Sequence, residues 1–408
     1  MSGPIVIVGA GHAGFQAAAS LAEANLGRRL VLVNGEDVAP YQRPPLSKAY
    51  LSAKADVGSL AFRLPSFYET SGIELTTGTA VGIDRAAQAL HLADGSAMDF
   101  DNLILACGGR ARRLPVPGAE LDGVFRLTRL SDATVLRDRL RGGLRVAIVG
   151  AGFVGLEFAS VATAAGCVVT VLEAGTRAAA RALSPLMSAH LGQRHVDAGV
   201  DMRLGASVTA FEGIDGRLAT VVLASGERLD VDLVLVAIGI DAETSLAANA
   251  GLEIDNGIVV DSQFRTSAPN IMAIGDCCTV TWAGGVGRVR LESVQSATEH
   301  GRIVAAALAG RPVPAIGLPL FWSEQVGVML QIAGLSLGID DWLDCHLPNG
   351  AYAVFGFRQD RLAVCETAQA PSLHMLSRRI LSAPGSITRS HLVRHELNLK
   401  AASADLVA

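Results

Sequence analysis

The chain has 408 residues, of which 50% are hydrophobic and 5% aromatic, and it contains 44 glycines. This length predicts two or three domains, and the aliphatic, glycine-rich composition is typical of α/β proteins with tight turns between strands and helices. The mild net charge of −5 argues against attraction of the whole protein to nucleic acid.

The chain opens on a pattern typical of dinucleotide binding. The apolar stretch Ile5–Val8 predicts a strand, an alanine-rich helix follows, and a second strand at Leu30–Val33 ends near Glu36. The loop between the first strand and the helix carries three glycines with G-x-G-x-x-G spacing: Gly9, Gly11 and Gly14. Such a loop places a pyrophosphate at the helix N-terminus, and the downstream acid accepts hydrogen bonds from ribose hydroxyls.

The same pattern recurs in the middle of the chain, before a strand that ends at Glu173. Its glycines are Gly150, Gly152 and Gly155. An acid at the position of Glu173 favours NADH over NADPH, although Arg177 could accommodate a 2′-phosphate. We reject a transmembrane span over Val154–Leu172, because Glu157 interrupts it and Gly166 divides it into a helix and a strand.

Three further apolar strands end in polar or glycine-containing turns. The first leads into Cys107 and Gly108, the second into Gly239, and the third ends at Asp276. A carboxylate at such a strand end could bind sugar-like hydroxyls beside a phosphate site, or it could be an ordinary turn aspartate.

The cysteines and histidines show no metal-binding spacing. The six cysteines are Cys107, Cys167, Cys277, Cys278, Cys345 and Cys365. We interpret them as reduced, buried side chains of a cytoplasmic protein, although a strained disulfide between the adjacent Cys277 and Cys278 stays open. His391 and His395 lack a third ligand, so we predict no metal site. The first strand begins almost at the start methionine, which leaves no room for a presequence.

Several segments together resemble the NADH-dependent ferredoxin reductases of bacterial oxygenase systems, the putidaredoxin reductase type of two-dinucleotide flavoproteins. The resemblance covers nearly the whole chain. Beside the two glycine loops and Asp276, the segments that carry it are Tyr41–Lys48 (YQRPPLSK), Arg290–Ser293 (RLES) and Pro319–Gln325 (PLFWSEQ).

This resemblance implies two Rossmann-like domains and a C-terminal α+β domain. The FAD-binding domain would comprise residues 1–112 and 240–316, the NAD-binding domain 113–239, and the C-terminal domain 317–408. The residues expected to contact FAD are Gly9, Gly11, Gly14, Glu36, Arg43, Lys48, Cys107, Gly108, Asp276, Val294 and Trp322. Those expected to contact NADH are Gly150, Gly152, Gly155, Glu157, Glu173 and Gly239.

The resemblance also implies an enzyme that moves a hydride from NADH to FAD and passes single electrons to a [2Fe-2S] ferredoxin, which would serve a cytochrome P450 or a ring-hydroxylating oxygenase. Lys48 would be a flavin-facing cation paired with Glu157, and Trp322 would pack near the flavin ring. The ordinary alternatives are a solvated loop lysine and an aromatic side chain at a domain interface. Because no cysteine precedes Cys107, the chemistry of the disulfide reductases in this superfamily is excluded.

The expected partner is an acidic ferredoxin bound through a basic patch. Its candidate residues are Arg63, Arg302, Arg378 and Arg379. We expect a monomer or weak dimer that binds neither nucleic acid nor membrane. The alternatives are a rubredoxin reductase and an NADH-responsive flavoprotein similar to apoptosis-inducing factor.

Overall fold

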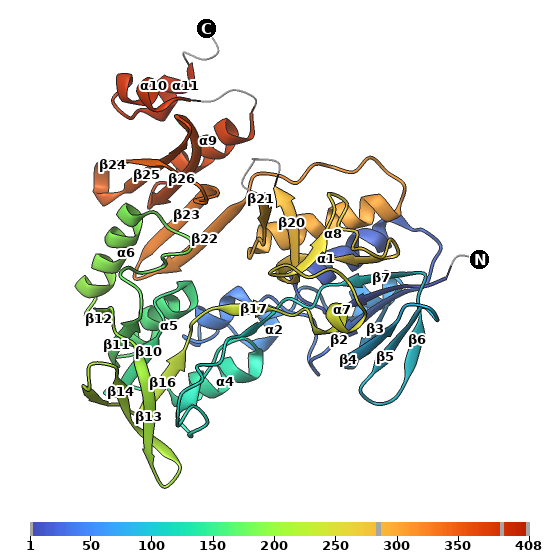
Figure 1. Cartoon of the computed structure of the whole chain (residues 1–408), viewed down its shortest axis with the longest axis horizontal. Coiled ribbons are helices and arrows are strands. Elements are labelled where there is room, and N and C mark those ends of the chain that lie inside the picture. Colours follow the sequence, from blue (N-terminus) through green and yellow to red (C-terminus); the bar gives the residue numbers. More distant parts are fainter. Residues whose placement is uncertain (1–2, 283–286, 384–386, 405–408) are drawn as a thin grey trace. The chain divides into compact units, whose positions relative to one another are not determined.

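The computed structural model describes residues 3–282, 287–383 and 387–404. The chain divides into two compact units, and many of their elements are labelled in Figure 1. Unit 1 contains Met1–Arg43, Val57–Arg110 and Asp241–Pro319. Unit 2 contains Pro44–Asp56, Ala111–Ile240 and Leu320–Ala408.

Unit 1 is built on a parallel sheet of five strands in the order β19-β7-β1-β2-β3. These strands are β1 (Ile5–Val8), β2 (Leu30–Asn34), β3 (Ile73–Thr77), β7 (Asn102–Leu105) and β19 (Ile271–Ala273). Every residue of β1 and β2 is buried, as in parallel strands that are covered on both faces. Helix α1 (His12–Ala24) connects β1 to β2, so the predicted βαβ unit is confirmed.

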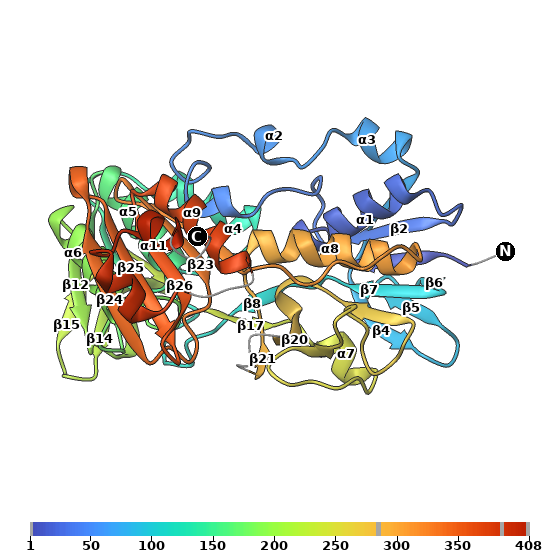
Figure 2. The ribbon, with the colours of Figure 1, turned by 90° about the horizontal axis from the view of Figure 1, so that it is seen from above.

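Two smaller sheets and several helices complete unit 1. Helix α8 (Val294–Leu308) lies beside α1, as Figures 1 and 2 show. The first small sheet is antiparallel: β4 (Ala80–Asp84), β5 (Ala89–Leu92) and β6 (Ala97–Asp99). The second contains β18 (Ile258–Val260), β20 (Cys278–Trp282) and β21 (Gly287–Val289). The short helices are α2 (Val57–Leu60), α3 (Pro65–Thr70), α7 (Ser245–Asn249) and the 3-10 turn η2 (Gly275–Cys277).

Unit 2 contains a second parallel sheet, in the order β12-β11-β10-β16-β9. Its strands are β9 (Val124–Phe125), β10 (Arg145–Val149), β11 (Val168–Glu173), β12 (Asp201–Leu204) and β16 (Leu233–Val236). Its helices are α4 (Leu130–Arg139), α5 (Phe153–Ala164) and α6 (Pro185–Asp197). An antiparallel sheet follows: β13 (Val208–Ile214), β14 (Arg217–Leu223) and β15 (Arg228–Asp230). Strands β8 (Gly109–Ala111) and β17 (Ile240–Ala242) pair where the chain passes from one unit to the other.

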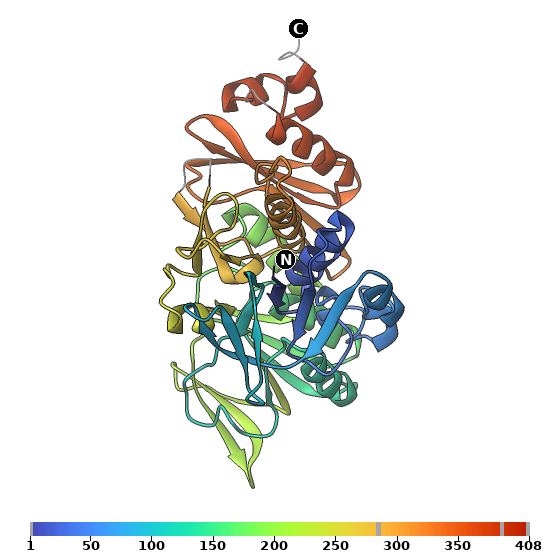
Figure 3. The same ribbon diagram turned by 90° about the vertical axis from the view of Figure 1, so that its right-hand side faces the viewer.

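The remaining part of unit 2 is an antiparallel sheet with helices, in the order β22-β23-β26-β25-β24. Its strands are β22 (Leu320–Gln325), β23 (Val328–Gly334), β24 (Asp341–His346), β25 (Tyr352–Arg358) and β26 (Arg361–Ala368). The helices are α9 (Pro371–Ser382), α10 (Arg389–Arg394), α11 (Leu399–Ala404) and the turn η3 (Pro348–Gly350). Figure 3 shows these red helices beside the orange strands. Phe355 and Phe357 of β25 share a buried hydrophobic cluster with Leu392 and Leu399 of the helices.

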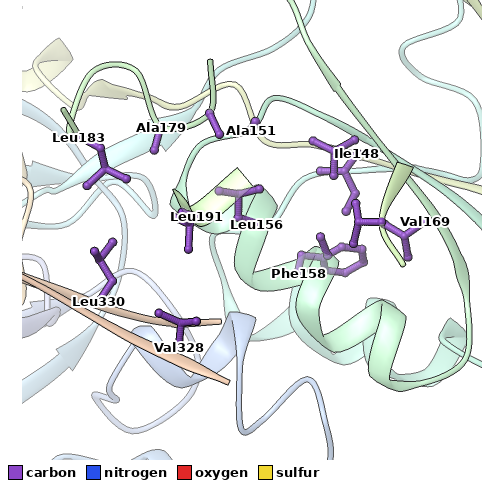
Figure 4. Close-up of a cluster of buried hydrophobic side chains, with 14 of the residues drawn as sticks. Ile148, Ala151, Leu156, Phe158, Val169, Ala179, Leu183, Leu191, Val328 and Leu330 are labelled. Carbon is purple, nitrogen blue, oxygen red and sulfur yellow. The ribbon is translucent and has the colours of Figure 1, made fainter. Parts of the chain in front are cut away.

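One hydrophobic core joins the parallel sheet of unit 2 to the C-terminal sheet. Figure 4 shows Leu156 and Phe158 of α5 in the same buried cluster as Val328 and Leu330 of β23. Because these side chains exclude water together, the second glycine loop and the C-terminal sheet are held in one body.

The segment Pro44–Asp56 belongs to unit 2, although the residues on both sides of it belong to unit 1. It begins with the turn η1 (Pro44–Ser47). Tyr50 is buried, donates or accepts a 2.8 Å hydrogen bond with Thr134 of α4, and has the guanidinium of Arg137 over its ring. Leu51 joins the hydrophobic core of unit 2. These contacts fix the segment that carries Lys48.

The observed architecture confirms the predicted α/β class, with a C-terminal part that mixes helices with an antiparallel sheet. The three-domain division stays a prediction. Among the described residues, no helix has the length and apolar character needed to cross a membrane.

Candidate functional site

The first glycine loop forms an open helix N-terminus. Gly9 has a φ of 104°, which favours glycine, and a Cβ on Gly14 would overlap the carbonyl oxygen of Gly9. Gly11 is the N-cap of α1, and within the described ranges no side chain caps this helix. The first N–H groups of α1 and its positive dipole end are therefore available to a phosphate.

Polar side chains gather beside this loop. Glu36 accepts a 2.9 Å hydrogen bond from the Tyr41 hydroxyl and forms a 2.9 Å ion pair with Arg43. The Arg43 guanidinium lies close to Gly11, because a Cβ built on Gly11 would be 3.9 Å from its Nε. Burial, and Arg43 second, lower the pKa of His12 to about 4, so this ring at the start of α1 is neutral at pH 7. The first glycine loop thus has uncapped N–H groups and lies beside the positively charged side chain of Arg43.

Asp276 lies in η2, directly after β19, and reaches the same region of unit 1. A Cβ on Gly275 would be 2.9 Å from the Cβ of Ala13, so η2 packs against the first turn of α1. Burial and the nearby Glu292 raise the pKa of Asp276 to about 7, although Arg290 and Arg43 oppose this shift. A buried carboxyl group needs hydrogen-bond partners, and sugar-like hydroxyls can supply them.

These observations fit FAD in unit 1. The glycine loop, Arg43 and Asp276 together offer partners for a pyrophosphate and for hydroxyl groups. Glu36, the predicted ribose contact, lies two residues after the end of β2. The other predicted positions are Cys107 and Gly108, which follow β7, and Val294, which begins α8. Their roles stay predictions.

The second glycine loop repeats this construction in unit 2. Gly152 is the N-cap of α5, again without a side-chain cap among the described residues. Gly155 packs against Gly150, because a Cβ on Gly155 would overlap the carbonyl oxygen of Gly150. Gly239 follows β16 with a φ of 96° and lies near the guanidinium of Arg181. The four predicted glycines therefore come together at the carboxyl end of the sheet, where dinucleotides bind.

Glu173 and Arg177 bear on the choice between NADH and NADPH. Glu173 accepts hydrogen bonds from the backbone N–H groups of Ala151 (2.8 Å) and Gly175 (2.7 Å). The Arg177 guanidinium donates to the carbonyl oxygens of Leu183 (2.6 Å) and Ala180 (2.8 Å). Arg177 is thus engaged by the backbone, while the carboxylate of Glu173 stands beside the glycine loop.

Lys48 and Glu157 form an ion pair within unit 2, with 2.6 Å between Nζ and Oε2. Their side chains are 18% and 6% exposed, so the alternative of a solvated loop lysine is wrong. Glu157 lies on α5, two residues after Gly155. Trp322 of β22 is 45% exposed, and its ring centroid is 5.5 Å from the Lys48 ammonium. The structure thus brings the three predicted catalytic side chains together beside the second glycine loop.

Sequence reasoning missed two serines that complete the setting of Glu157. Ser47 donates to Oε2 and Ser323 donates to Oε1, both at 2.5 Å. Distances of this kind are typical of hydroxyl donors to a carboxylate. Both serines lie inside the segments that carried the resemblance, next to Lys48 and Trp322, and this adjacency was the available signal.

The cysteines of unit 1 are poorly suited to thiol exchange. All six cysteines of the chain are free thiols. Burial raises the pKa of Cys107 and Cys278 well above the ordinary value, and that of Cys277 to about 11. Because the thiolate is the reactive form, these groups are unreactive near neutral pH. That electrons do not pass to a cysteine of this chain stays a prediction.

Two parallel sheets, each with an uncapped glycine loop and an acid at the end of the following strand, define an oxidoreductase that binds two dinucleotides. Family comparisons support this class. Residues 3–301 match the family model described as pyridine nucleotide-disulphide oxidoreductase, and residues 320–403 match a reductase C-terminal domain.

Individual relatives cover almost the whole chain. Rhodocoxin reductase from Rhodococcus erythropolis is 43% identical over 402 residues, which are 98% of this chain and 94% of the relative. A rubredoxin-NAD(+) reductase from Pseudomonas putida is 39% identical, over 90% of this chain and 96% of the relative. The crystal structure of the ferredoxin reductase for the CYP199A2 system from Rhodopseudomonas palustris has 40% identity and a TM-score of 0.94, and the match covers 98% of this chain and 99% of that one.

The chain belongs to the pyridine nucleotide-disulphide oxidoreductase family and carries its reductase C-terminal domain. It is an FAD- and NAD(H)-dependent enzyme. The fold class and the resemblance stated from the sequence are therefore confirmed.

Proposed function

We propose that this enzyme transfers electrons from NADH through FAD to a [2Fe-2S] ferredoxin that serves a cytochrome P450 or a ring-hydroxylating oxygenase. The observation that carries the proposal is the Lys48–Glu157 ion pair, which is held at the start of α5 directly after the second glycine loop. Relatives named as reductases of small electron carriers support the identity of the acceptor.

FAD would bind to residues 1–112 and 240–316, and NADH would bind to residues 113–239. Residues 317–408 would form the C-terminal domain. When bound, FAD takes up a hydride with its two electrons from NADH, which becomes NAD⁺, and it can release the two electrons singly. In unit 1, Arg43 and the N–H groups of α1 would bind the pyrophosphate, Glu36 the ribose and Asp276 the ribitol hydroxyls. Cys107, Gly108 and Val294 would line the remainder of the FAD site.

The residues of unit 2 would bind and orient the nicotinamide nucleotide. Gly150, Gly152 and Gly155 leave room for its pyrophosphate, Glu173 would accept from the ribose 2′-hydroxyl, and Gly239 would border the site. Arg177 is held by two carbonyl oxygens, so it does not offer its charge to a 2′-phosphate. We therefore propose NADH as the donor.

Lys48 would hold a positive charge where negative charge develops during hydride transfer. Glu157 keeps the ammonium group in place, because the two side chains are largely buried and 2.6 Å apart. Trp322 covers the ammonium group and would shield the reacting groups from water. A fixed charge in a dry site stabilises a transition state more than a mobile, solvated one.

The ferredoxin would bind through basic side chains. Arg63 and Arg302 of unit 1 and Arg378 and Arg379 of unit 2 are all exposed. Positive charge at these positions would attract an acidic carrier and make its association sensitive to salt. We propose that the enzyme works in the cytoplasm, because all six cysteines are unpaired, and that it is a monomer or weak dimer.

A rubredoxin is the second candidate acceptor, because a rubredoxin-NAD(+) reductase is 39% identical to this chain. The two are separated by measuring NADH-dependent cytochrome c reduction with a panel of [2Fe-2S] ferredoxins and rubredoxins. We expect strong, salt-sensitive stimulation by a [2Fe-2S] ferredoxin. Stimulation by rubredoxin alone would replace the proposed acceptor, and no stimulation by any carrier would favour an NADH-responsive flavoprotein.

A further inference from the structure

The hydrogen bonds of Glu157 continue past Ser323 to the interior of unit 2. The Nε2 group of Gln325 donates to the Ser323 hydroxyl at 3.0 Å, and the Gln325 Oε1 atom lies 2.7 Å from Nε2 of His195. Ser323 and Gln325 are two residues apart on β22, so they lie on the same face of that strand. His195 is on α6. All three side chains are buried.

The direction of every hydrogen bond in this series, which runs from Glu157 to His195, follows from the carboxylate of Glu157. An ionised Glu157 can only accept, so the Ser323 hydroxyl must donate to it. The Ser323 oxygen then accepts from the NH₂ group of Gln325, which turns the amide oxygen of Gln325 toward His195. That oxygen can only accept, so His195 must donate from Nε2.

The ring of His195 is consistent with this order. Burial lowers the pKa of His195, which makes the ring neutral near pH 7. Among the described residues, its Nδ1 atom is buried without a hydrogen-bond partner. A neutral ring with its proton on Nε2 leaves only a lone pair on Nδ1, which is less costly to bury unpaired than an N–H group on a charged ring.

We propose that Ser323 and Gln325, anchored by His195, are positioning residues that fix the carboxylate of Glu157 and through it the ammonium group of Lys48. The inference rests on the proposed function, in which Lys48 acts during hydride transfer. This series of hydrogen bonds does not relay protons, because the amide of Gln325 donates and accepts without releasing a proton. Its effect is to remove the rotational freedom of a glutamate side chain, which otherwise weakens any ion pair that it makes.

The hydrogen bonds that reach Glu157 can be distinguished from other contacts between β22 and α5. Ser160, on the same helix as Glu157, accepts a 2.8 Å hydrogen bond from the backbone N–H of Val326. That bond ties the end of β22 to α5 without reaching Glu157. Ser160→Ala is therefore a matched control, since it removes one hydrogen bond between the same two elements and leaves the setting of Lys48 intact.

The first test is kinetic and uses the FAD-loaded protein. We expect Ser323→Ala to slow reduction of the flavin by NADH about tenfold, which corresponds to ~1.4 kcal/mol, in stopped-flow experiments. The dissociation constant of NAD⁺, measured from the change in the flavin absorption spectrum, should stay within about twofold of that of the native protein. Ser323→Thr, which keeps the hydroxyl, should restore most of the rate, and Ser160→Ala should not change it.

The second test reads the hydrogen-bond order without catalysis. In the FAD-loaded protein labelled with ¹⁵N-histidine, the His195 signal is assigned by its loss in His195→Asn. We expect a neutral ring protonated on Nε2 between about pH 6 and 8. Gln325→Met, which has a similar volume but no amide, should change this signal and slow flavin reduction in the same direction as Ser323→Ala. It also replaces Ser323→Ala if that variant does not fold.

The outcomes distinguish this inference from the proposed function. A His195 ring protonated on Nδ1 would overturn the inferred order. An unchanged rate in Ser323→Ala, or a rate loss matched by an equal loss of NAD⁺ affinity or by Ser160→Ala, would overturn the positioning role while the proposed function stands. Failure of NADH to reduce the flavin of the native protein would refute the proposed function, and the histidine signal would still test the hydrogen-bond order.

Discussion

At the scale of single residues, Lys48 and Glu157 form a largely buried ion pair. Both side chains are mostly removed from water, and each charge is compensated by the other. Removing one member of such a pair leaves an uncompensated buried charge, which is typically worth ~3–5 kcal/mol of destabilisation. Variants at this site therefore need a measurement of the chemical step that is independent of stability.

Lys48→Ala provides the first prediction at this scale. We expect reduction of the flavin by NADH to slow by ~10–100-fold, because the fixed positive charge is lost. The ratio of bound FAD to protein should fall much less. Stopped-flow absorbance and the flavin-to-protein ratio give the two numbers. Lys54→Ala removes an exposed lysine of the same segment and should behave as the native protein does. An unchanged rate in Lys48→Ala would contradict the assigned role.

The second prediction at this scale concerns Glu173 and Arg177. We expect Glu173→Ala to reduce the preference for NADH over NADPH, measured as the ratio of the two kcat/KM values, by about tenfold. Arg177→Leu should leave this ratio unchanged but lower the thermal midpoint, because its guanidinium supports two carbonyl oxygens before α6. A large change of cofactor preference in Arg177→Leu would mean that this side chain reaches the nucleotide.

Among the elements, α6 and β26 are joined by a buried carboxyl group. Ser184, the N-cap of α6, donates its backbone N–H to Glu366 at 2.8 Å, and its hydroxyl bonds to the same side chain. Burial raises the pKa of Glu366 to about 7, even though hydrogen bonds from Ser184 and Ser336 oppose the shift. The start of this helix therefore depends on a group that titrates near neutral pH.

The sign of the resulting pH dependence follows from the raised pKa. The folded protein binds a proton at Glu366 between about pH 4.5 and 7 that the unfolded chain does not, so the free energy of unfolding falls as the pH rises through this window, by at most ~3 kcal/mol. Glu366→Gln mimics the protonated form and should flatten the dependence of the thermal midpoint on pH between about 5 and 8. An equally steep dependence in this variant would assign it to other groups.

The elements also show how far sequence reasoning reached. The strands before both glycine loops, the helices after them and the acids at or just after the ends of β2 and β11 follow from local patterns, namely apolar runs, glycine spacing and strand length. The structure contains them. The family resemblance predicted that Lys48 pairs with Glu157, and the structure contains this ion pair.

Other features depend on contacts between residues far apart in sequence. The sequence of Pro44–Asp56 has no periodicity from which its packing on α4 and α5 could be predicted. The hydrogen bonds of Ser323, Gln325 and His195 join β22 to α5 and α6, which are far from it in sequence. The order of strands in the C-terminal sheet is equally non-local. A single sequence contains no signal for such pairings beyond the presence of polar side chains in an otherwise buried strand.

For the whole molecule, the relevant property is a net negative charge with local basic positions. The net charge of −5 would repel an acidic carrier on average, so productive binding depends on where the arginines lie. Arg378 and Arg379 are adjacent and exposed on α9, which makes them the sharpest test of the docking proposal.

We expect the double variant Arg378→Glu, Arg379→Glu to raise the KM for a [2Fe-2S] ferredoxin by about tenfold or more and to weaken the salt dependence of the reaction. Flavin reduction by NADH should not change, since neither side chain belongs to the nucleotide sites. The control is Arg217→Glu, which makes the same change of charge at an exposed arginine of β14. If Arg217→Glu is as harmful per charge as the double variant, the effect reflects net charge and not a docking surface.

The assignment of Pro44–Asp56 to unit 2 also determines when the site can form during synthesis. Ser47 is 110 residues before Glu157, and Glu157 is 166 residues before Ser323. A ribosome makes these three segments in that order, so the loop with Lys48 emerges long before the helix and the strand that hold it. Contacts of such large sequence separation form late in folding. A nascent chain can therefore pair β1, β2, β3 and β7 early, whereas β19 joins their sheet only after β16 has been made. The setting of Lys48 is completed later still, after β22 has left the ribosome.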